Sequence, residues 1–390
     1  MLKDYYGGML DKGATSFWED FDVEWIKDSG RIDDLPKDGQ KDIHGDYGKF
    51  CYTGFRHSLC HGWSCGPIAF LTETVLGVHV SDGGKKITVE PSLCGLEFAD
   101  GSIPTPYGKA EIRVLDNLRS GYLHNLAGLD VEFIRGDVRD RAAVAKAVEG
   151  CDYVFHLAAM ISVPESMFKM EECVDINVNG LLTVLEESAK AGVKKLCFST
   201  SAAIYGDNPV VPKVETMIPE PKSPYAITKL DGEYYCNIFT QTGKLKTACL
   251  RYFNVFGPRQ DPKSAYAAAV PIFTAKAIAN EDVTIFGDGE QTRDFIYVKD
   301  IVEANVFMAT HDFTGVYNIA YGGRITINDL VKQIMEVTHS KSRVLHLEER
   351  PGDVKHSMAG IEKLKSTGFR PKYDFAYGME QTIRFFAGQK

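Results

Sequence analysis

The sequence predicts an α/β protein with a doubly wound parallel sheet and a small C-terminal subdomain, preceded by a fragment of different character. Two observations lead to this prediction. From residue 111 onward, short apolar runs typical of buried strands alternate with amphipathic segments typical of helices. Before residue 110 the chain is rich in Gly and aromatic residues and shows no such alternation. The change in pattern predicts a domain boundary between residues 109 and 110.

Five runs in the second part are expected to be buried strands. They are Glu111–Leu115, Val131–Ile134, Tyr153–His156, Lys194–Phe198 and Thr247–Arg251. Three amphipathic segments between them are expected to be helices: Ala142–Glu149, Glu171–Ala191 and Pro224–Thr242. A doubly wound sheet binds its ligand at the carboxyl ends of its strands, so polar residues at those ends are candidates for a site.

The first part of the chain shows weaker patterns. Gly13–Phe21 and Leu59–Leu76 are helix-like, and the polar stretch Lys27–Lys49 between them is typical of a loop. Lys86–Glu90 and Leu96–Ala99 are strand-like. This part is therefore expected to be a mixed fragment of helices and strands.

Composition excludes several classes of function. The net charge of −9 and the pI of about 5.6 argue against a nucleic-acid partner. No apolar run approaches the roughly 20 residues of a membrane span, and the N-terminus lacks a signal-peptide core. The nine Cys form no C-x-x-C pair, so we expect reduced thiols, a cytoplasmic location and no metal site.

A tyrosine and a lysine four residues apart are the first candidates for chemistry. Tyr225 and Lys229 lie in SPYAITKLDGEYY and would share one face of a helix. A nearby cation favours the phenolate, so Lys229 is expected to lower the pKa of Tyr225 toward neutrality. Such a phenol is a general base for a sugar hydroxyl. The alternative for this pair alone is an ordinary exposed helix pair.

A serine at the end of a strand strengthens the first interpretation. Ser201 ends the run KKLCFSTS, where an apolar strand opens into hydroxyl-bearing residues. A hydroxyl at this place can relay a proton between a substrate and Tyr225. Alone, Ser201 could equally be a turn or cap residue. The strand followed by STS and then by Tyr-x-x-x-Lys is far more specific than either part.

Several segments in this order resemble the extended short-chain dehydrogenase/reductases. They are FHLAAMISVPES, VDINVNG, FSTSAAIYGDNP, SPYAITKLDGEYY, LRYFNVFGPRQDP and GDGEQTRDFIYVKDIVEAN. Within that family, residues 111–390 look most like bacterial UDP-sugar 4-epimerases, including the UDP-N-acetylglucosamine 4-epimerase group. The resemblance implies a Rossmann-like fold, a bound NAD and a sugar transiently oxidised to a 4-keto form.

The resemblance also implies roles for individual residues. Tyr225 would be the catalytic base, Lys229 its partner and a ligand of the nicotinamide ribose, and Ser201 the relay. The other residues implied to bind the cofactor are Asp116, Asn117, Asp137, Val138, Leu157, Ala158, Ala159, Asn177 and Phe253. With Ser201, the residues implied to bind the UDP-sugar are Asn254, Arg293, Arg350, Asp353 and Ser357. Asp116 fits the acid that favours NAD over NADP, and the Arg pair suits a diphosphate.

Residues at two positions indicate which reaction is catalysed and which substrate is bound. Related 4,6-dehydratases carry an Asp-Glu pair directly after the Ser/Thr position, where this chain has Ala202–Ala203, so the resemblance implies epimerisation. Strict UDP-galactose epimerases carry a bulky Tyr where this chain has Ser357. A small residue leaves room for an N-acetyl group. UDP-GlcNAc/UDP-GalNAc is therefore favoured, and UDP-Glc/UDP-Gal stays open.

The family's first strand and Gly-rich loop are missing. The family begins with a strand followed by G-x-x-G-x-x-G, whose glycines let the backbone approach the NAD pyrophosphate. No such motif precedes Asp116, and Gly7–Gly8 and Gly83–Gly84 are isolated pairs. We therefore expect a sheet without its first βα unit and an epimerase impaired in holding its cofactor.

Residues 7–109 resemble the end of a bacterial α-L-rhamnosidase instead. The segments are GGMLDKGATSFWEDFD, SLCHGWSCGPIAFLTETVLGV and KKITVEPSLCGLEFADGSIPTPYG. Glu19 matches that family's general base and His61 a sugar-pocket residue. Inverting hydrolysis needs a second carboxyl, which would lie in a portion that this chain lacks, so hydrolase activity is not expected.

The predicted organisation has two domains. Residues 1–109 form the rhamnosidase-like fragment, and residues 110–390 the NAD-dependent epimerase/dehydratase domain, with 110–250 mainly binding cofactor and 251–390 mainly binding substrate. The family implies a homodimer through helices such as Glu171–Ala191 and Pro224–Thr242. Two alternatives stay open: an inactive chimeric fusion, and a glycoside hydrolase fragment.

Overall fold

The computed structural model describes residues 78–81, 86–89, 111–262, 269–349 and 355–388. The chain divides into two compact units, Met1–Glu111 and Ile112–Lys390. In the first unit the described residues form an antiparallel hairpin of β1 (Val78–Ser81) and β2 (Lys86–Val89). The strand expected at Lys86–Glu90 is thus present. The other elements expected before residue 110 lie outside the described residues.

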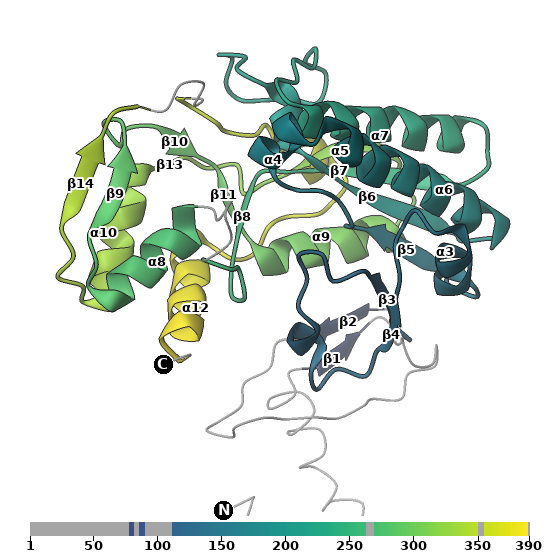
Figure 1. Ribbon diagram of the computed structural model, residues 1–390, viewed down its shortest axis with the longest axis horizontal. Coiled ribbons are helices and arrows are strands. Elements are labelled where there is room, and N and C mark those ends of the chain that lie inside the picture. The colour runs from purple at the N-terminus through teal and green to yellow at the C-terminus, as the bar shows by residue number, and fades with distance from the viewer. Residues whose placement is uncertain (1–77, 82–85, 90–110, 263–268, 350–354, 389–390) are drawn as a thin grey trace, which may run out of the picture. The chain divides into compact units, whose positions relative to one another are not determined.

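A four-stranded parallel sheet is the centre of the second unit (Figure 1). Its order is β12 (Gly315–Ile319), β7 (Lys246–Tyr252), β6 (Lys195–Ser201) and β5 (Tyr153–His156). The two central strands, β6 and β7, are buried over nearly their whole length. Strands buried on both faces are typical of parallel sheets covered by helices on two sides.

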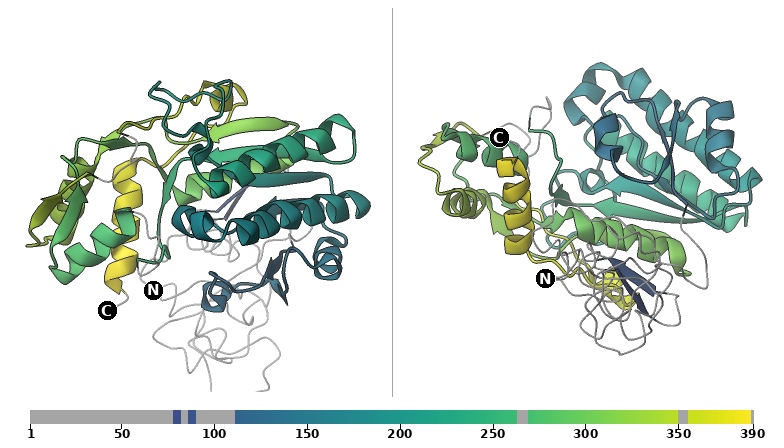
Figure 2. Two further views of the ribbon diagram at one scale, coloured as in Figure 1. Left: turned by 45° about the horizontal axis from the view of Figure 1, so that its top comes forward. Right: turned by 90° about the horizontal axis from the view of Figure 1, so that it is seen from below.

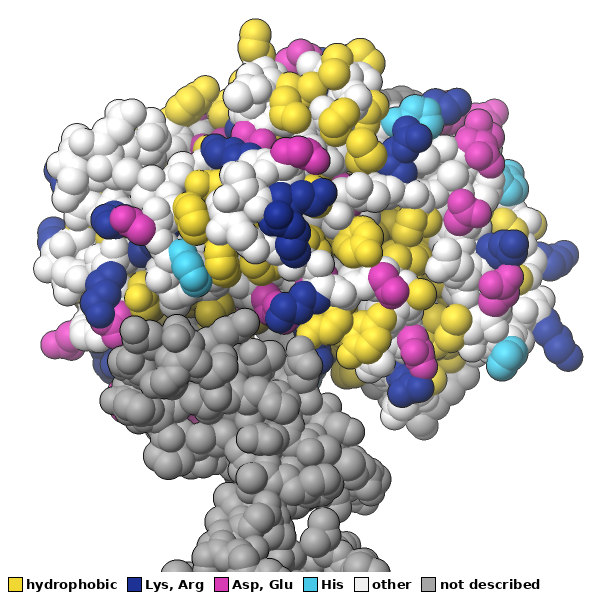
Figure 3. Space-filling model, turned by 180° about the vertical axis from the view of Figure 1, so that it is seen from behind, with side chains coloured by type: hydrophobic (Ala, Val, Ile, Leu, Met, Phe, Trp, Pro, Cys, Tyr) yellow, Lys and Arg dark blue, Asp and Glu magenta, His cyan; other side chains and the backbone are white. Residues whose placement is uncertain are grey.

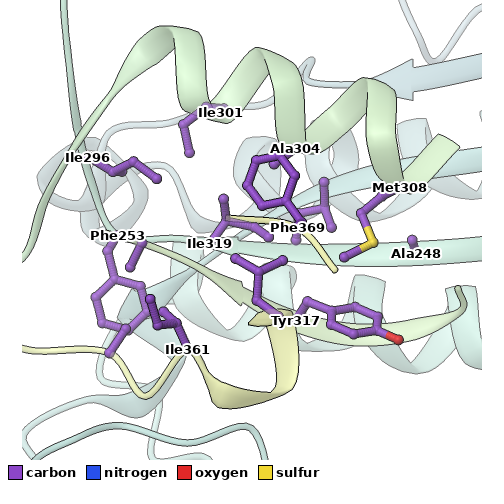
Figure 4. Close-up of a cluster of buried hydrophobic side chains, with 14 of the residues drawn as sticks. Ala248, Phe253, Ile296, Ile301, Ala304, Met308, Tyr317, Ile319, Ile361 and Phe369 are labelled. Atoms are coloured by element: carbon purple, nitrogen blue, oxygen red, sulfur yellow. The ribbon is translucent and has the colours of Figure 1, made fainter. Parts of the chain in front are cut away.

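Helices cover both faces of this sheet, as the sequence predicted (Figure 2). On one face, α3 (Arg141–Val148), α6 (Gly180–Lys190) and α7 (Pro224–Gln241) pack with Phe198 of β6. On the other face, α9 (Val298–Thr310) packs with Cys197 of the same strand. Figure 4 shows Ile301, Ala304 and Met308 of α9 in this second cluster. The alternation of neighbouring β6 residues between the two cores is the two-residue period of a strand.

A buried ion pair fixes α7 against the sheet. Arg251 of β7 donates two hydrogen bonds to the carboxylate of Glu233, at 2.8 and 2.7 Å. Both side chains are 4% exposed, and Thr200 of β6 donates to the same carboxylate at 2.9 Å. Gly232 lies so close to the ring of Phe198 that an added Cβ would be 2.5 Å from it. Together these contacts set the position of the helix that carries Tyr225 and Lys229.

Two further strands form a separate parallel pair. β3 (Arg113–Asp116) pairs with β4 (Glu132–Arg135), and no described strand joins β3 to β5. Phe155 on β5 is 40% exposed and Leu157 just beyond it is 57% exposed. Arg113 ties β3 to α3, because its guanidinium donates to the carbonyls of Ala147 and Glu149 at the end of that helix. Within the described residues, β3 and β4 thus form a parallel pair separate from the four-stranded sheet.

The C-terminal part forms a second packed lobe. β8 (Asn254–Phe256) pairs with β11 (Phe295–Tyr297), β9 (Val283–Phe286) with β14 (Val344–Leu347), and β10 (Thr292–Arg293) with β13 (Ile325–Thr326). The helices are α8 (Ala269–Ala279), α10 (Ile327–Thr338), α11 (Glu362–Ser366) and α12 (Phe375–Gly388). Phe256, Leu330 and Ile383 belong to the core of this lobe.

The helix expected at Glu171–Ala191 is interrupted. After α4 (Val163–Phe168), the structure has α5 (Met170–Val174), a π-helical turn η5 (Asp175–Asn179) and then α6. A π turn adds a residue to the helix and is common at functional sites. The spacing of apolar residues in the sequence did not reveal the π turn, because α5, η5 and α6 follow one another as one continuous helix. Two short 3-10 turns occur elsewhere, η4 (Leu123–Leu126) and η6 (Ala202–Tyr205).

Candidate active site

The Tyr225–Lys229 pair lies in the first turns of α7. The side chain of Ser223 caps this helix by accepting the N–H of Ala226 at 3.2 Å, and Pro224 occupies its first turn. Lys229 is 4% exposed, and its Nζ donates to the carbonyl of Ser199 on β6 at 2.8 Å. The same Nζ lies 5.8 Å from the centre of the Tyr225 ring. The helix therefore holds both residues near the carboxyl end of β6.

Ser201 is the last residue of β6 and reaches the same place. Its hydroxyl oxygen accepts the N–H of Ala203 at 3.2 Å, and the hydroxyl lies close enough to the phenol of Tyr225 to act on the pKa of that phenol. The three residues predicted to be catalytic are therefore neighbours in the fold. Because Ser201 lies beside Tyr225, a proton has a short route between the two hydroxyls.

One electrostatic expectation is wrong. Lys229 was expected to lower the pKa of Tyr225, but burial raises the pKa of Tyr225, and the hydrogen bond with Ser201 only opposes that rise. Burial also lowers the pKa of Lys229 itself to about 8. Desolvation penalises both charged forms here. Among the described contacts, the Lys229 ammonium donates to the Ser199 carbonyl and makes no hydrogen bond with the phenol.

Asn177 joins the elements beneath Tyr225. Its side chain lies in the π turn, accepts the N–H of Met160 at 2.7 Å and donates to the Met160 carbonyl at 3.2 Å. It also donates to the hydroxyl of Thr228 at 3.0 Å. Sequence reasoning missed Thr228, although it lies three residues after Tyr225 on the same helix. The network holds the segment after β5 against α7.

The residues expected at the adenosine end of the cofactor cluster at the ends of β3 and β4. A carboxylate oxygen of Asp116 accepts the N–H of Leu118 at 2.6 Å. Asn117 donates to Asp137 at 2.9 Å. Arg139 pairs with both oxygens of Asp137, at 2.8 Å each, and this holds the pKa of that carboxyl well below its usual range. Val138 lies in the same turn, against Gly180.

The residues expected along the cofactor follow β5. Leu157 and Ala158 are exposed, and Ala159 is half-buried. Asp116 lies at the carboxyl end of β3, and Leu157, Ala158 and Ala159 follow that of β5. These positions fit a nucleotide cofactor whose adenosine ribose lies near Asp116 and whose length runs past the residues after β5. The described residues show no Gly-rich cradle for its pyrophosphate. The guanidinium groups of Arg119 and Arg139 both pair with carboxylates.

The residues expected to bind substrate converge on one strand junction in the second lobe. The side chain of Asn254 donates to the backbone carbonyl of Asp294 at 3.2 Å, directly after Arg293. The N–H of Ser357 donates to the carbonyl of Thr292 at 3.0 Å. Arg350 and Asp353 lie outside the described residues. The structure thus brings Asn254, Arg293 and Ser357 together by backbone contacts that the sequence did not predict.

Phe253 has a different environment. Its side chain is 7% exposed and packs in the core cluster, with its ring centre 6.2 Å from that of Tyr205 (Figure 4). The ring therefore serves the core, and the contact expected with a cofactor would have to come from the backbone.

Other features of the described residues bear on the predictions made from composition. No group of three or more His, Cys, Asp and Glu that could hold a metal was found among them. Cys151, Cys173, Cys197, Cys236 and Cys249 are free thiols. None of the described helices has the length and apolar character needed to cross a membrane. Acidic and basic side chains are interspersed on the face seen in Figure 3.

Comparison with known proteins identifies the family. The model of the NAD dependent epimerase/dehydratase family matches residues 107–320. The chain is 33% identical over 301 residues to a putative UDP-glucose 4-epimerase of Methanocaldococcus jannaschii, covering 77% of this chain and 97% of that relative.

Solved structures agree with this match. A UDP-N-acetylglucosamine 4-epimerase of Methanobrevibacter ruminantium in complex with UDP-N-acetylmuramic acid is 41% identical, with a TM-score of 0.70 over 72% of this chain and 91% of that one. A Thermus thermophilus UDP-glucose 4-epimerase in complex with NAD is 35% identical, with a TM-score of 0.66 over 71% and 91%. These matches confirm the resemblance to NAD-dependent UDP-sugar 4-epimerases, the Rossmann-like parallel sheet and the NAD cofactor predicted from the sequence: the chain belongs to the NAD dependent epimerase/dehydratase family.

Proposed function

We propose that this chain catalyses NAD-dependent epimerisation at C4 of a UDP-sugar. The observation that carries the proposal is the meeting of Ser201, Tyr225 and the buried Lys229 at the carboxyl end of β6. In its phenolate form, Tyr225 takes the proton of the C4 hydroxyl, directly or through Ser201, as the C4 carbon is oxidised to a ketone. Asp116 and Lys229 are among the residues that would hold NAD, which when bound would serve as acceptor and donor of the hydride. Tyr225 then returns the proton to the C4 oxygen.

The residues after Ser201 support epimerisation over dehydration. Loss of water from a hexose requires a further acid and base next to the reacting carbon. Ala202 and Ala203 occupy this place and form the 3-10 turn η6. Neither side chain can exchange a proton, so the oxidised sugar keeps its C6 hydroxyl and the reaction ends in reduction at C4.

Ser357 supports an N-acetylated substrate, UDP-GlcNAc/UDP-GalNAc. We expect Ser357→Tyr to lower the rate with UDP-GlcNAc about tenfold to hundredfold relative to UDP-glucose, because the ring would fill the space that an N-acetyl group needs. Both rates can be measured by chromatography of the sugar nucleotides. Ser366→Tyr, at an exposed position of α11, is the control. Equal loss with both substrates would contradict this role, and no conversion of either by the parent chain would contradict the proposed function.

A homodimer through α7 and the helices beside it is also proposed. Tyr234 and Ile238 are 57% and 50% exposed, and Ile227 at the start of the same stripe is 47% exposed. On the neighbouring segment, Phe168 is 89% and Met170 55% exposed. Apolar side chains at helical spacing on two adjacent surfaces are typical of a helix-mediated interface.

Tyr234→Glu is expected to convert the dimer to a monomer, since it places a charge in the middle of the apolar stripe. Light scattering coupled to size-exclusion chromatography measures the mass directly. Val337→Glu makes a similar change at a position of α10 that is 46% exposed, and should leave the mass unchanged. A monomeric parent chain, or a Tyr234→Glu variant that stays dimeric, would exclude this interface.

The remaining hypotheses concern residues 1–110. We propose that the Gly-rich loop is absent there and that cofactor affinity suffers for it. The rhamnosidase-like fragment carries Glu19 and His61, both outside the described residues, so no geometry supports hydrolysis. An inactive fusion stays the second candidate, favoured by the separation of β3 and β4 from the four-stranded sheet.

A further inference from the structure

A buried carboxylate lies at the centre of the substrate-side residues. Asp294, between β10 and β11, is 0% exposed. Its oxygens accept backbone N–H groups from three residues: Tyr321 at 3.2 Å, Gly322 at 3.2 Å to each oxygen, and Ala359 at 3.1 Å. Among the described residues, no Lys, Arg or His forms an ion pair with it. Its negative charge is thus held by backbone amides of two separate segments.

These contacts connect the segments that carry Asn254, Arg293 and Ser357. The backbone carbonyl of Asp294 accepts both the N–H and the side-chain amide of Asn254, at 3.1 and 3.2 Å. Arg293 is the preceding residue in the chain. Ser357 lies two residues before Ala359, whose N–H the carboxylate accepts. A single residue therefore contacts all three segments of the candidate substrate site.

The segment with Ser357 is also held by Thr292, Lys213 and Asn318. The Thr292 hydroxyl bonds the ring of His356 at 3.1 Å, and the Asn318 side chain donates to the carbonyl of Gly360 at 3.2 Å. Thr292 bonds the backbone at Lys355 and Ser357, at 2.9 and 3.0 Å. Lys213 accepts the N–H of Gly360 at 2.7 Å and donates to the carbonyl of Met358 at 2.8 Å. The N–H of Ala359 takes no part in that pairing and points to Asp294. The carboxylate thus links this segment by hydrogen bonds to the loop at Tyr321 and Gly322.

Burying the carboxylate of Asp294 costs free energy of folding, which indicates that this side chain has a specific role. Burial raises the pKa of Asp294 to about 6, and the backbone hydrogen bonds from Ala359 and Gly322 oppose that rise. At neutral pH the ionised carboxylate therefore disfavours the folded state, relative to the same group in water. A neutral or apolar residue would avoid this cost, but no neutral side chain can accept bonds from all three amides at once.

We propose that Asp294 is a positioning residue that fixes Asn254, Arg293 and Ser357 relative to one another and so determines the affinity for the uridine diphosphate part of the substrate. This inference rests on the proposed function. Asp294 touches no reacting atom, and it acts through the backbone of the three segments that it joins.

A second buried aspartate provides a matched control. Asp300 is also 0% exposed, accepts the backbone N–H groups of Lys372 and Tyr373 at 2.7 and 3.3 Å, and has its pKa raised by burial to about 6. None of its hydrogen-bond partners is a candidate site residue. Asp300→Asn therefore reports the general cost of altering such a carboxylate.

The test compares Asp294→Asn with Asp300→Asn and the parent chain. An Asn oxygen can still accept from Tyr321 and Gly322, but its amide group would then face the N–H of Ala359, donor against donor. Calorimetry with UDP alone as the probe should show about tenfold to hundredfold weaker binding for Asp294→Asn and about twofold change or less for Asp300→Asn. Amide hydrogen exchange at Ala359 and Gly360 should accelerate in Asp294→Asn and not in Asp300→Asn.

The UDP affinity and the exchange rate at Ala359 each test the proposal. Parent-like UDP binding by a folded Asp294→Asn variant overturns the proposal, and so does unchanged exchange at Ala359. Should Asp294→Asn fail to fold, Ala359→Pro removes the N–H donor of the same hydrogen bond while it also fixes φ at that residue, and it must weaken UDP binding in the same way. A parent chain that does not bind UDP overturns the proposed function and the affinity role with it, while the exchange measurement separately decides whether Asp294 holds the segment.

Discussion

Tyr225→Phe is expected to lower the rate of UDP-sugar epimerisation by about 10²–10⁴-fold, because it removes the group that exchanges a proton with the C4 oxygen. The ring keeps its volume, so α7 and the packing around it stay intact. UDP affinity should be unchanged, since the residues expected to bind UDP lie in the second lobe. The rate is measured by chromatography of UDP-GlcNAc and UDP-GalNAc, and the affinity by calorimetry with UDP.

Tyr235→Phe is the matched control for this change. Tyr235 lies on the same helix, is half-buried and packs against the core on the other side from the site. The same loss of a hydroxyl there should leave the rate within about twofold of the parent chain. A Tyr225→Phe variant that retains a tenth or more of the parent rate would show that another group moves the proton.

Much of the fold followed from the sequence because its elements have simple local causes. Strand β6 contains the apolar run Leu196–Phe198 and is buried over nearly its whole length, as expected for a strand covered on both faces. Helix α7 begins where Ser223 and Pro224 provide a cap and a preset first turn. These signals depend on neighbouring residues alone, so they can be seen without the tertiary structure.

The features that escaped sequence reasoning depend on distant contacts. The pKa of Tyr225 rises because the surroundings of α7 exclude water, and the spacing to Lys229 carries no information about burial. The π turn at Asn177 is coupled to the backbone of Met160, which lies in another segment. Asp294 gave no signal in QTRDF because its partners, Gly322 and Ala359, are far away in the chain.

The sequence predicts that the first βα unit is missing, and the described strand pairing is interrupted between β3 and β5. β3 pairs only with β4 among the described strands, and β5 ends the four-stranded sheet with Phe155 partly exposed. Both groups are parallel, and a strand placed between β3 and β5 would join them into one sheet. A two-stranded parallel pair is marginal alone. The gap in the sequence motif and the break in strand pairing therefore concern the same part of the fold.

Replacing residues 1–110 with a strand, a G-x-x-G-x-x-G turn and a helix is expected to raise NAD affinity by about 10²–10⁴-fold. Two backbone N–H groups at a helix N-terminus would then bond the pyrophosphate, and bonds to charged groups contribute about 1.5–3 kcal/mol each. NAD bound to the purified protein can be extracted and measured, and calorimetry gives the affinity.

The same graft with Val in place of its three glycines separates the effect of the added strand on the sheet from the effect of the loop on phosphate binding. Its strand can still join β3 to β5, so amide exchange in both strands should slow in either graft, while only the glycine-containing loop admits the phosphates. Equal NAD content in the parent chain and both grafts would mean that cofactor binding depends neither on residues 1–110 nor on the glycines. Slower exchange with no gain in NAD would then place the defect beyond the loop. A gain that needs the glycines would show that the chain retains the other parts of a cofactor site and lacks the part that holds the pyrophosphate.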